Sequence, residues 1–191
     1  MLQNQTVTNA RFLFMNNGEQ KIFFQHCLYD ALIKLMREKS FSDISISSLC
    51  NTAGVSRMTY YRSYTCKEDI LMQHLEECFH KYLEQLTSFG KPTFYDIADT
   101  FFHFWQGEEQ VFLSAVIKSG LSSQLVDSFC NYLEEIYSLI DFGQPIESFV
   151  KSFLAGGLYK MLVDWIKEGG TTPVESMASF LANGSKVLAE L

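Results

Sequence analysis

The chain has little proline, few charged residues and no long hydrophobic run. Three of its 191 residues are proline, and 19% are charged. No apolar run approaches the ~20 residues of a membrane-spanning helix, and the N-terminal segment lacks the basic and apolar regions of a secretory signal peptide. At 47% hydrophobic residues, the composition excludes intrinsic disorder. We therefore expect a folded cytoplasmic protein with no membrane partner.

Motifs for metal binding and catalysis are missing as well. The five cysteines are widely spaced, with no C-x-x-C motif and no Cys/His pair at metal-ligand spacing. This spacing favours cysteines that act as small apolar residues in a reducing cytosol, with a redox or metal-binding role as the alternative. The sequence has no G-x-S-x-G elbow, P-loop or H-E-x-x-H motif. It therefore predicts no enzyme, no metal site and no cofactor.

Strand-like alternation is almost absent, whereas hydrophobic residues recur at spacings of three and four. This spacing predicts about nine helices, the first over about residues 19–39. Thr65 and Glu68 predict a capping box at the start of a long helix, and Gly90-Lys-Pro92 interrupts the helical pattern after it. We expect an all-α fold with a flexible leader at 1–18, a first helical domain at 19–66, a connecting helix at 67–90 and a second helical domain at 91–191.

Residues 45–64 of the first domain read as two short helices joined by a glycine turn. Ser45 can cap the first helix, and Gly54 supplies the left-handed conformation that a residue with a Cβ resists. Ser56 can cap the second helix, which begins at Arg57. Two short helices joined in this way place the second for insertion into the major groove. The segment therefore predicts a helix-turn-helix.

Side chains of the second helix suit contacts with DNA. Arg57 can donate a bidentate pair to guanine or phosphate, and the tyrosines offer hydroxyls and apolar faces to phosphate and the thymine methyl group. Lys67, with the amides of the next helix N-terminus, predicts a phosphate site. The alternative is that the turn arose by chance and the tyrosine pair belongs to the core. The predicted DNA-contacting residues are Ser45, Ser56, Arg57, Met58, Thr59, Tyr60, Tyr61 and Lys67.

The same segment resembles the TetR family of bacterial transcriptional regulators over about residues 18–77. The resemblance implies phosphate contacts from Tyr61 and Lys67, and a repressor that binds a palindromic operator as a homodimer and is released or modulated by a small-molecule effector. The chain departs from the family pattern at Met58, where a small residue is usual, and at Ser63-Tyr64, where His-Phe is common. The matching positions are Ser45, Ile46, Leu49, Ala53-Gly-Val-Ser56, Tyr61 and Cys66-Lys-Glu-Asp-Ile-Leu71.

The last two predicted helices carry an apolar stripe wider than one neighbour within the chain needs. Gly156-Gly157 would also allow another helix to approach closely. We expect these helices to pack against their two-fold mates in a four-helix bundle, with burial within one chain as the alternative. The predicted dimer interface is Phe149, Phe153, Gly157, Met161, Met177, Phe180, Leu181 and Leu188.

Aromatic residues are abundant, with 17 phenylalanines, nine tyrosines and two tryptophans. Those in the second domain predict a pocket for an apolar or aromatic small molecule, although a solid core would give the same pattern. The predicted pocket residues are Phe101, Phe102, His103, Trp105, Phe112, Phe129, Tyr132 and Tyr159.

The net charge of −7 is unevenly distributed along the chain. Residues 1–67 contain eight Lys and Arg against four Asp and Glu, a balance of +4, whereas residues 68–191 contain seven against 18, a balance of −11. The acidic excess therefore belongs to the second domain and does not argue against DNA binding. Two alternative functions remain: a regulator or activator controlled by a protein partner, and a helical interaction module that does not bind DNA.

Overall fold

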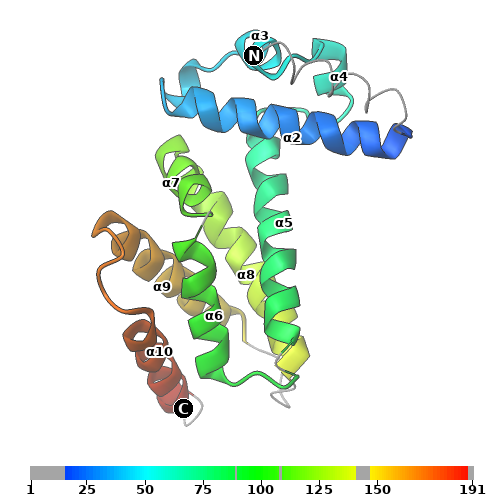
Figure 1. The fold of residues 1–191 in the computed structure, drawn as a ribbon. Helices are drawn as coiled ribbons and strands as arrows, with labels where there is room; N and C mark the ends of the chain where they lie inside the picture. The colour runs from blue at the N-terminus through cyan, green and yellow to red at the C-terminus, as the bar shows by residue number, and fades with distance from the viewer. Residues whose placement is uncertain (1–15, 89, 108, 141–146, 189–191) are drawn as a thin grey trace. The chain divides into compact units, whose positions relative to one another are not determined.

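The computed structural model describes residues 16–88, 90–107, 109–140 and 147–188, with residues 139–140 and 185–188 described for their backbone alone. Most of the predicted leader at 1–18 lies outside these ranges. Within them the regular elements are nine α-helices and one short 3-10 helix (Figure 1), which confirms the all-α prediction. Contacts divide the chain into two compact units between His74 and Leu75, inside the segment expected to be the connecting helix.

The first unit consists of four helical elements and the beginning of a fifth. An Asn16–Glu19 capping box starts α2 (Asn17–Met36), since the Asn16 side chain accepts from the amide of Glu19 at 3.0 Å and Glu19 accepts from that of Asn16 at 2.8 Å. Helix α3 packs against α2. The remaining elements are η1 (Phe41–Asp43), α3 (Ile46–Ala53), α4 (Arg57–Tyr61) and the start of α5 (Glu68–Thr87).

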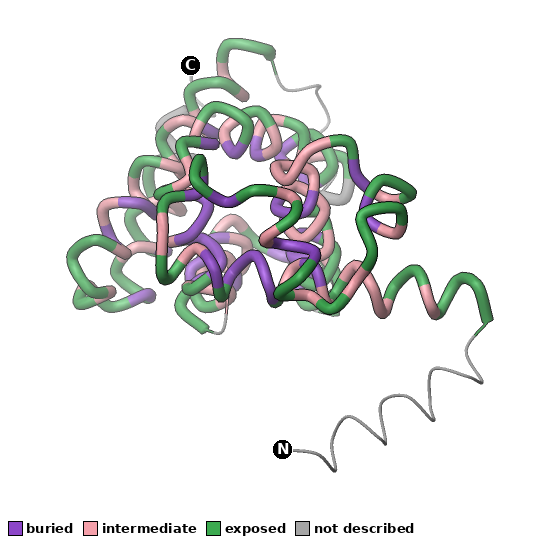
Figure 2. Tube along the Cα trace, turned by 90° about the horizontal axis from the view of Figure 1, so that it is seen from above, coloured by how far each residue is buried: buried purple, intermediate pink, exposed green. Residues whose placement is uncertain are grey.

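The second unit contains the rest of α5 and five further helices. Helix α10 packs against α6, and α8 packs against α9. The Trp165 indole N–H donates to the carbonyl of Thr172 at 2.8 Å and so fastens the loop between α9 and α10. Figure 2 shows buried and exposed positions alternating along the helices, as amphipathic helices require. The five helices are α6 (Phe94–Gln106), α7 (Gln110–Ser119), α8 (Ser122–Ile140), α9 (Ser148–Lys167) and α10 (Val174–Leu188).

None of the helices in the described ranges is both long enough and apolar enough to cross a bilayer.

The predicted capping box at the start of α5 is wrong in its partners. The carboxylate of Asp69, and not that of Glu68, accepts from the amides of Thr65 at 2.8 Å and Cys66 at 3.0 Å. Because α5 begins at Glu68, the carboxylate of the next residue is the one that reaches the unpaired amides before the helix.

Substitution of Gly54 tests the left-handed turn of the first unit. Gly54 has φ of +69°, so Gly54→Ala should lower the free energy of unfolding by about 1 kcal/mol. Gly156→Ala is the control, because it lies within α9 and a Cβ there meets nothing within 4 Å; it should raise stability by roughly 0.5–1 kcal/mol. Urea denaturation followed by circular dichroism measures both, and a neutral Gly54→Ala would contradict the turn geometry.

Candidate DNA interface and ligand pocket

Helices α3 and α4 are joined by a short turn whose caps match the sequence prediction. The Ser45 hydroxyl accepts from the amide of Ser48 at 3.1 Å and starts α3. Gly54 then takes the left-handed conformation, and the Ser56 hydroxyl accepts from the amide of Thr59 at 3.1 Å to start α4. Both predicted caps and the predicted glycine conformation are confirmed.

Helix α4 presents a mixed basic and apolar surface to solvent, made of Arg57, Met58, Tyr61 and Arg62, which we term the α4 face. Met58 and Tyr61 are 69% and 59% exposed, and both arginines are exposed. Thr59 is half-buried, and its hydroxyl lies 2.9 Å from that of Ser56. Arg62 was not among the predicted contacts, although its position four residues after Met58 already placed it on this face.

Tyr60 does not belong to this surface, and its prediction as a DNA contact is wrong. Its side chain is 0% exposed and packs edge-on against Tyr61, with ring centroids 5.1 Å apart. Burial raises the pKa of its hydroxyl, which has no hydrogen-bond partner among the described residues. Because Tyr60 and Tyr61 are adjacent on a helix, they project about 100° apart, so one enters the core when the other faces solvent.

Lys67 is also placed differently from its prediction as a phosphate contact. Its ammonium donates to the carbonyls of Phe41, Ser42 and Ile44, at 3.4 Å to Ser42 and 3.0 Å to Ile44. It lies 4.4 Å from the centroid of the Phe41 ring as well, a cation–π contact. The carboxylate of Asp69 also binds the amides of Thr65 and Cys66, so the lysine and two of the amides near the start of α5 have partners within the protein. Lys67 therefore ties η1 to the start of α5.

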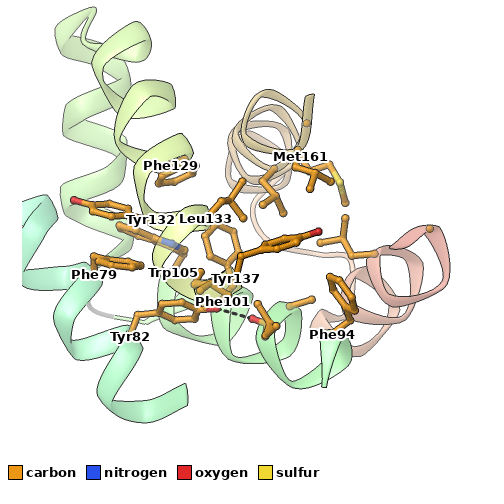
Figure 3. Close-up of a pocket in the computed structure, with 18 of the residues that line it drawn as sticks. Phe79, Tyr82, Phe94, Phe101, Trp105, Phe129, Tyr132, Leu133, Tyr137 and Met161 are labelled. Carbon is orange, nitrogen blue, oxygen red and sulfur yellow. Dashed lines mark hydrogen bonds between the residues drawn. The ribbon is translucent and has the colours of Figure 1, made fainter. Parts of the chain in front are cut away.

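The second unit contains a cavity of about 510 Å³. Figure 3 shows aromatic side chains from α5, α6 and α8 meeting around it, with Met161 of α9 on the opposite side. Four of the predicted pocket residues line it: Phe101, Trp105, Phe129 and Tyr132. The other lining residues are Leu75, Cys78, Phe79, Tyr82, Phe94, Ile97, Ala98, Leu133, Ile136, Tyr137, Phe153, Leu154, Gly157, Leu158, Met161, Phe180, Leu181 and Gly184.

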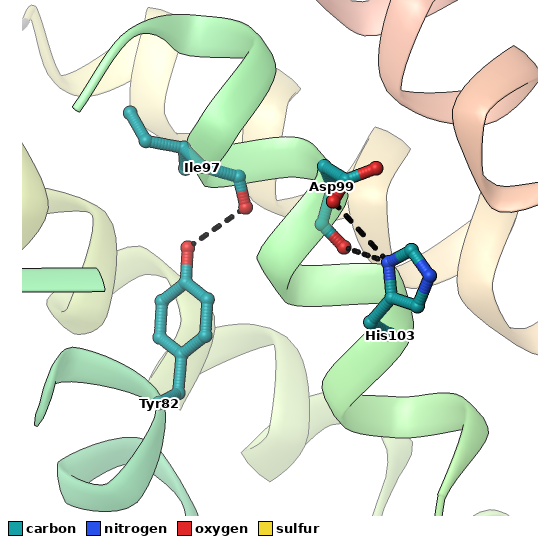
Figure 4. A network of polar contacts seen from close by, with 4 residues as sticks. All are labelled: Tyr82, Ile97, Asp99 and His103. Carbon is teal, nitrogen blue, oxygen red and sulfur yellow. Dashed lines mark hydrogen bonds and ion pairs between the residues drawn. The ribbon is translucent and has the colours of Figure 1, made fainter. Parts of the chain in front are cut away.

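The other four predicted pocket residues lie elsewhere. Phe102 and Phe112 are fully buried, in contact with Trp165 and Trp105 respectively. The Tyr159 hydroxyl donates to that of Ser122 at 2.7 Å. His103 is exposed, with Nδ1 3.0 Å from the carbonyl and 3.3 Å from the carboxylate of Asp99 (Figure 4). Successive helix positions differ by about 100°, so Phe101 can face the cavity when its two successors on α6 cannot.

Several lining residues that the sequence analysis missed come from α5 and α8. Phe79 stacks on Tyr132 with ring centroids 3.7 Å apart. The Tyr82 hydroxyl donates to the carbonyl of Ile97 at 3.1 Å (Figure 4). The sequence shows the apolar spacing of α5, but it predicts this helix as the connection between the domains. The signal for its aromatic residues in the pocket is therefore the apolar stripe alone.

The predicted dimer interface overlaps the cavity. Five of its residues line the cavity: Phe153, Gly157, Met161, Phe180 and Leu181. Phe149, Phe153 and Phe180 are also 73%, 67% and 68% exposed, and Met177 is half-buried. The side chain of Leu188 lies outside the described residues. We refer to the exposed surface formed by Phe149, Phe153 and Phe180 as the phenylalanine face.

The fold has counterparts among solved structures. Lin0861 from Listeria innocua superposes with a TM-score of 0.79 at 16% identity, over 91% of this chain and 95% of that one. DhaS, the dihydroxyacetone kinase operon activator, superposes with a TM-score of 0.58 at 19% identity, over 88% and 96%. At these identities the likeness establishes the fold. No protein-family model and no curated protein matches the sequence.

Asp69 should make the first unit sensitive to acid. Burial raises the pKa of this carboxyl, but hydrogen bonds from Cys66 and Thr65 outweigh that effect and hold the pKa below the ordinary value of an aspartate. The ionised carboxylate therefore stabilises the folded state at neutral pH, and this stability is lost as the pH falls through the lowered pKa. Asp69→Asn should be less stable at pH 7 and lose less stability on acidification.

Chemical denaturation at pH 7 and at pH 3 measures this difference. Asp30→Asn serves as the control, because Asp30 is exposed on α2. If Asp69→Asn and Asp30→Asn gave equal changes at both pH values, the cap would have no measurable role in stability.

Proposed function

We propose that the chain is a DNA-binding transcriptional regulator of the TetR type, which binds a palindromic operator as a homodimer and responds to an apolar small molecule. The α4 face carries this proposal. The five-residue helix follows a left-handed turn and exposes Arg57, Met58 and Tyr61, and the exposed Arg62 directly follows it. This arrangement has the geometry and the chemistry of a recognition helix.

Each residue of the α4 face suits a particular DNA group. Arg57 and Arg62 offer guanidinium groups to phosphate or to guanine, and Met58 offers an apolar surface to a thymine methyl. Tyr61 offers a hydroxyl at the edge of the face. Lys67 is bound to backbone carbonyls, so the arginines supply the positive charge at this surface, and affinity depends on few phosphate contacts for each subunit.

The phenylalanine face supports the homodimer. Three exposed phenylalanines on two helices are unusual on a monomer surface. A two-fold dimer presents two recognition helices to successive major grooves, so half-sites should lie about one helical turn apart or a multiple of it.

The cavity supports a small-molecule effector over control by a protein partner, since the latter predicts a solid core. Helix α5 contributes Leu71 to buried packing in the first unit and Phe79 and Tyr82 to the cavity in the second. A ligand in the cavity would therefore act on the helix that follows the helix-turn-helix. The resemblance to the TetR family favours a repressor. An activator is the second candidate, because the structurally similar DhaS is an operon activator.

Substitutions of an arginine and a tyrosine on the α4 face test DNA binding. Against duplexes obtained by selection from a random pool, Arg57→Ala should weaken binding by roughly 1–3 kcal/mol, and Tyr61→Phe should weaken it less because it removes a single hydroxyl. If Arg57 contacts phosphate, the slope of log affinity against log salt should fall by about 1. Gel-shift titrations between 50 and 200 mM salt measure both quantities.

Lys118→Ala is the matched control, because Lys118 is an exposed cation on α7 in the second unit. It should leave operator affinity unchanged. Unaltered binding by Arg57→Ala and Tyr61→Phe together would refute the α4 face, and failure of the wild-type chain to bind any duplex would leave the helical interaction module as the better interpretation.

Sedimentation velocity at micromolar concentration tests the homodimer. The wild-type chain should sediment at twice the 21.9 kDa of one chain, and Phe149→Asp should shift it to the monomer because a carboxylate is costly in an apolar interface. Val111→Asp is the control, since Val111 is exposed on α7. A monomeric wild type, or a dimeric Phe149→Asp variant, would contradict the proposed interface.

A further inference from the structure

Among the residues that the structure describes, the wall of the cavity contains no charged side chain. None of the 22 described lining residues is Asp, Glu, Lys, Arg or His, and none is Asn, Gln, Ser or Thr. A charged ligand would lose its hydration on entry and meet no counter-ion among these residues, a large penalty in a low-dielectric site. The described wall therefore offers a ligand no ion pair.

Polar atoms of the wall are largely engaged with the protein itself. The Tyr82 hydroxyl donates to the Ile97 carbonyl at 3.1 Å. The Tyr132 hydroxyl is hydrogen-bonded to Ser128, and the Cys78 thiol to the carboxylate of Glu109. Burial raises the pKa of Tyr132 to about 12 and that of the Cys78 thiol above its usual value, so both groups stay neutral.

Helices on opposite sides supply the wall of the cavity. On one side Phe79 of α5 stacks on Tyr132 of α8. On the other side, α9 and α10 contribute both aromatic and aliphatic side chains: Phe153, Leu154, Leu158, Met161, Phe180 and Leu181. Figure 3 shows Phe79 and Tyr132 on one side of the space and Met161 of α9 on the other. The volume of about 510 Å³ is several times the ~150 Å³ of a cavity that holds a single benzene ring, so the space is larger than one ring needs.

We infer that the cavity binds an uncharged hydrophobic molecule larger than a single ring, selected by its size and by the absence of charge, with no ionic anchor. This inference rests on the proposed role of the cavity as the effector site. A volume of about 510 Å³ lies within the range of small-molecule sites, and the affinity comes from the apolar area that the ligand buries.

Primary n-alkanols provide the probe, with n-alkanoates and n-alkylamines of equal length as charged counterparts. Trp105 lines the cavity whereas Trp165 does not, and these are the two tryptophans of the chain. The Trp165→Phe variant therefore reports occupancy through Trp105 fluorescence alone. Titrations are run without DNA at pH 8, where the alkanoates are ionised and the alkylamines protonated.

The affinity of the alkanols should rise about fourfold for each added methylene until the cavity is filled, because each buried methylene contributes about 0.8 kcal/mol. Decan-1-ol should bind at least tenfold more tightly than decanoate or decylamine. Equal or tighter binding of either charged compound would overturn the inference, and so would an affinity that does not depend on chain length.

Two glycines of α9 give a matched pair of variants that places the ligand. A Cβ at Gly156 or Gly157 meets nothing within 4 Å, but Gly157 lines the cavity and Gly156 does not. In the Trp165→Phe background, Gly157→Leu should weaken decan-1-ol binding at least tenfold, whereas Gly156→Leu should preserve it. Circular dichroism checks the fold of both variants, and sedimentation checks their oligomeric state, so that a loss of dimer is told apart from a loss of ligand binding. Unchanged binding by Gly157→Leu would overturn the assignment to this cavity.

The result separates the ligand class from the proposed function. If decan-1-ol binds as expected but does not alter operator affinity, the ligand class holds and the proposed effector response fails. If the chain binds DNA but no alkanol quenches Trp105, DNA binding holds and the inference about the cavity fails.

Discussion

The short helix α4 depends on its neighbours for its existence, and this dependence determines which side chains reach the surface. A helix of five residues is far below the length at which an isolated helix is stable in water. It is held by the hydroxyl cap of Ser56 at its start and by the fully buried ring of Tyr60 on its inner side. With Tyr60 inside, Met58 and Tyr61 must point outward. The α4 face is thus a geometric consequence of one buried aromatic ring.

A second constraint acts where α5 begins. Lys67 satisfies carbonyls at the end of η1, and Asp69 satisfies the amides of Thr65 and Cys66. Two oppositely charged side chains, two residues apart, thus bind carbonyls at η1 and unpaired amides before α5. These contacts fix the segment that follows α4. Because this lysine is used inside the protein, the basic character of the proposed DNA surface comes from Arg57 and Arg62. The charge of a segment predicts its partners only when the charged groups face solvent.

Local patterns were sufficient for the fold and for the turn. Helical spacing predicted the all-α architecture, and Ser45, Gly54 and Ser56 act within four residues of their partners, so the sequence shows them directly. Four of the eight predicted pocket residues line the cavity, because its wall depends on which helices pack together and local patterns do not show this. Phe101 was found and Phe79 was missed, although both carry the same aromatic side chain. Tyr60 is buried and Tyr61 is exposed although they are the same residue type. Neighbouring helix positions point about 100° apart, and residue type alone does not show which of the two faces the core.

The overlap between the cavity and the proposed dimer interface bears on how a ligand could control the proposed regulator. Phe153 and Phe180 line the cavity and are also largely exposed on the phenylalanine face. A ligand in the cavity and a second copy of the chain on that face would therefore contact the same side chains. Two binding events that share side chains change each other's affinity, and the effect is reciprocal. No long pathway through the protein is needed for a ligand to influence dimerisation, because Phe153 and Phe180 belong to both proposed sites.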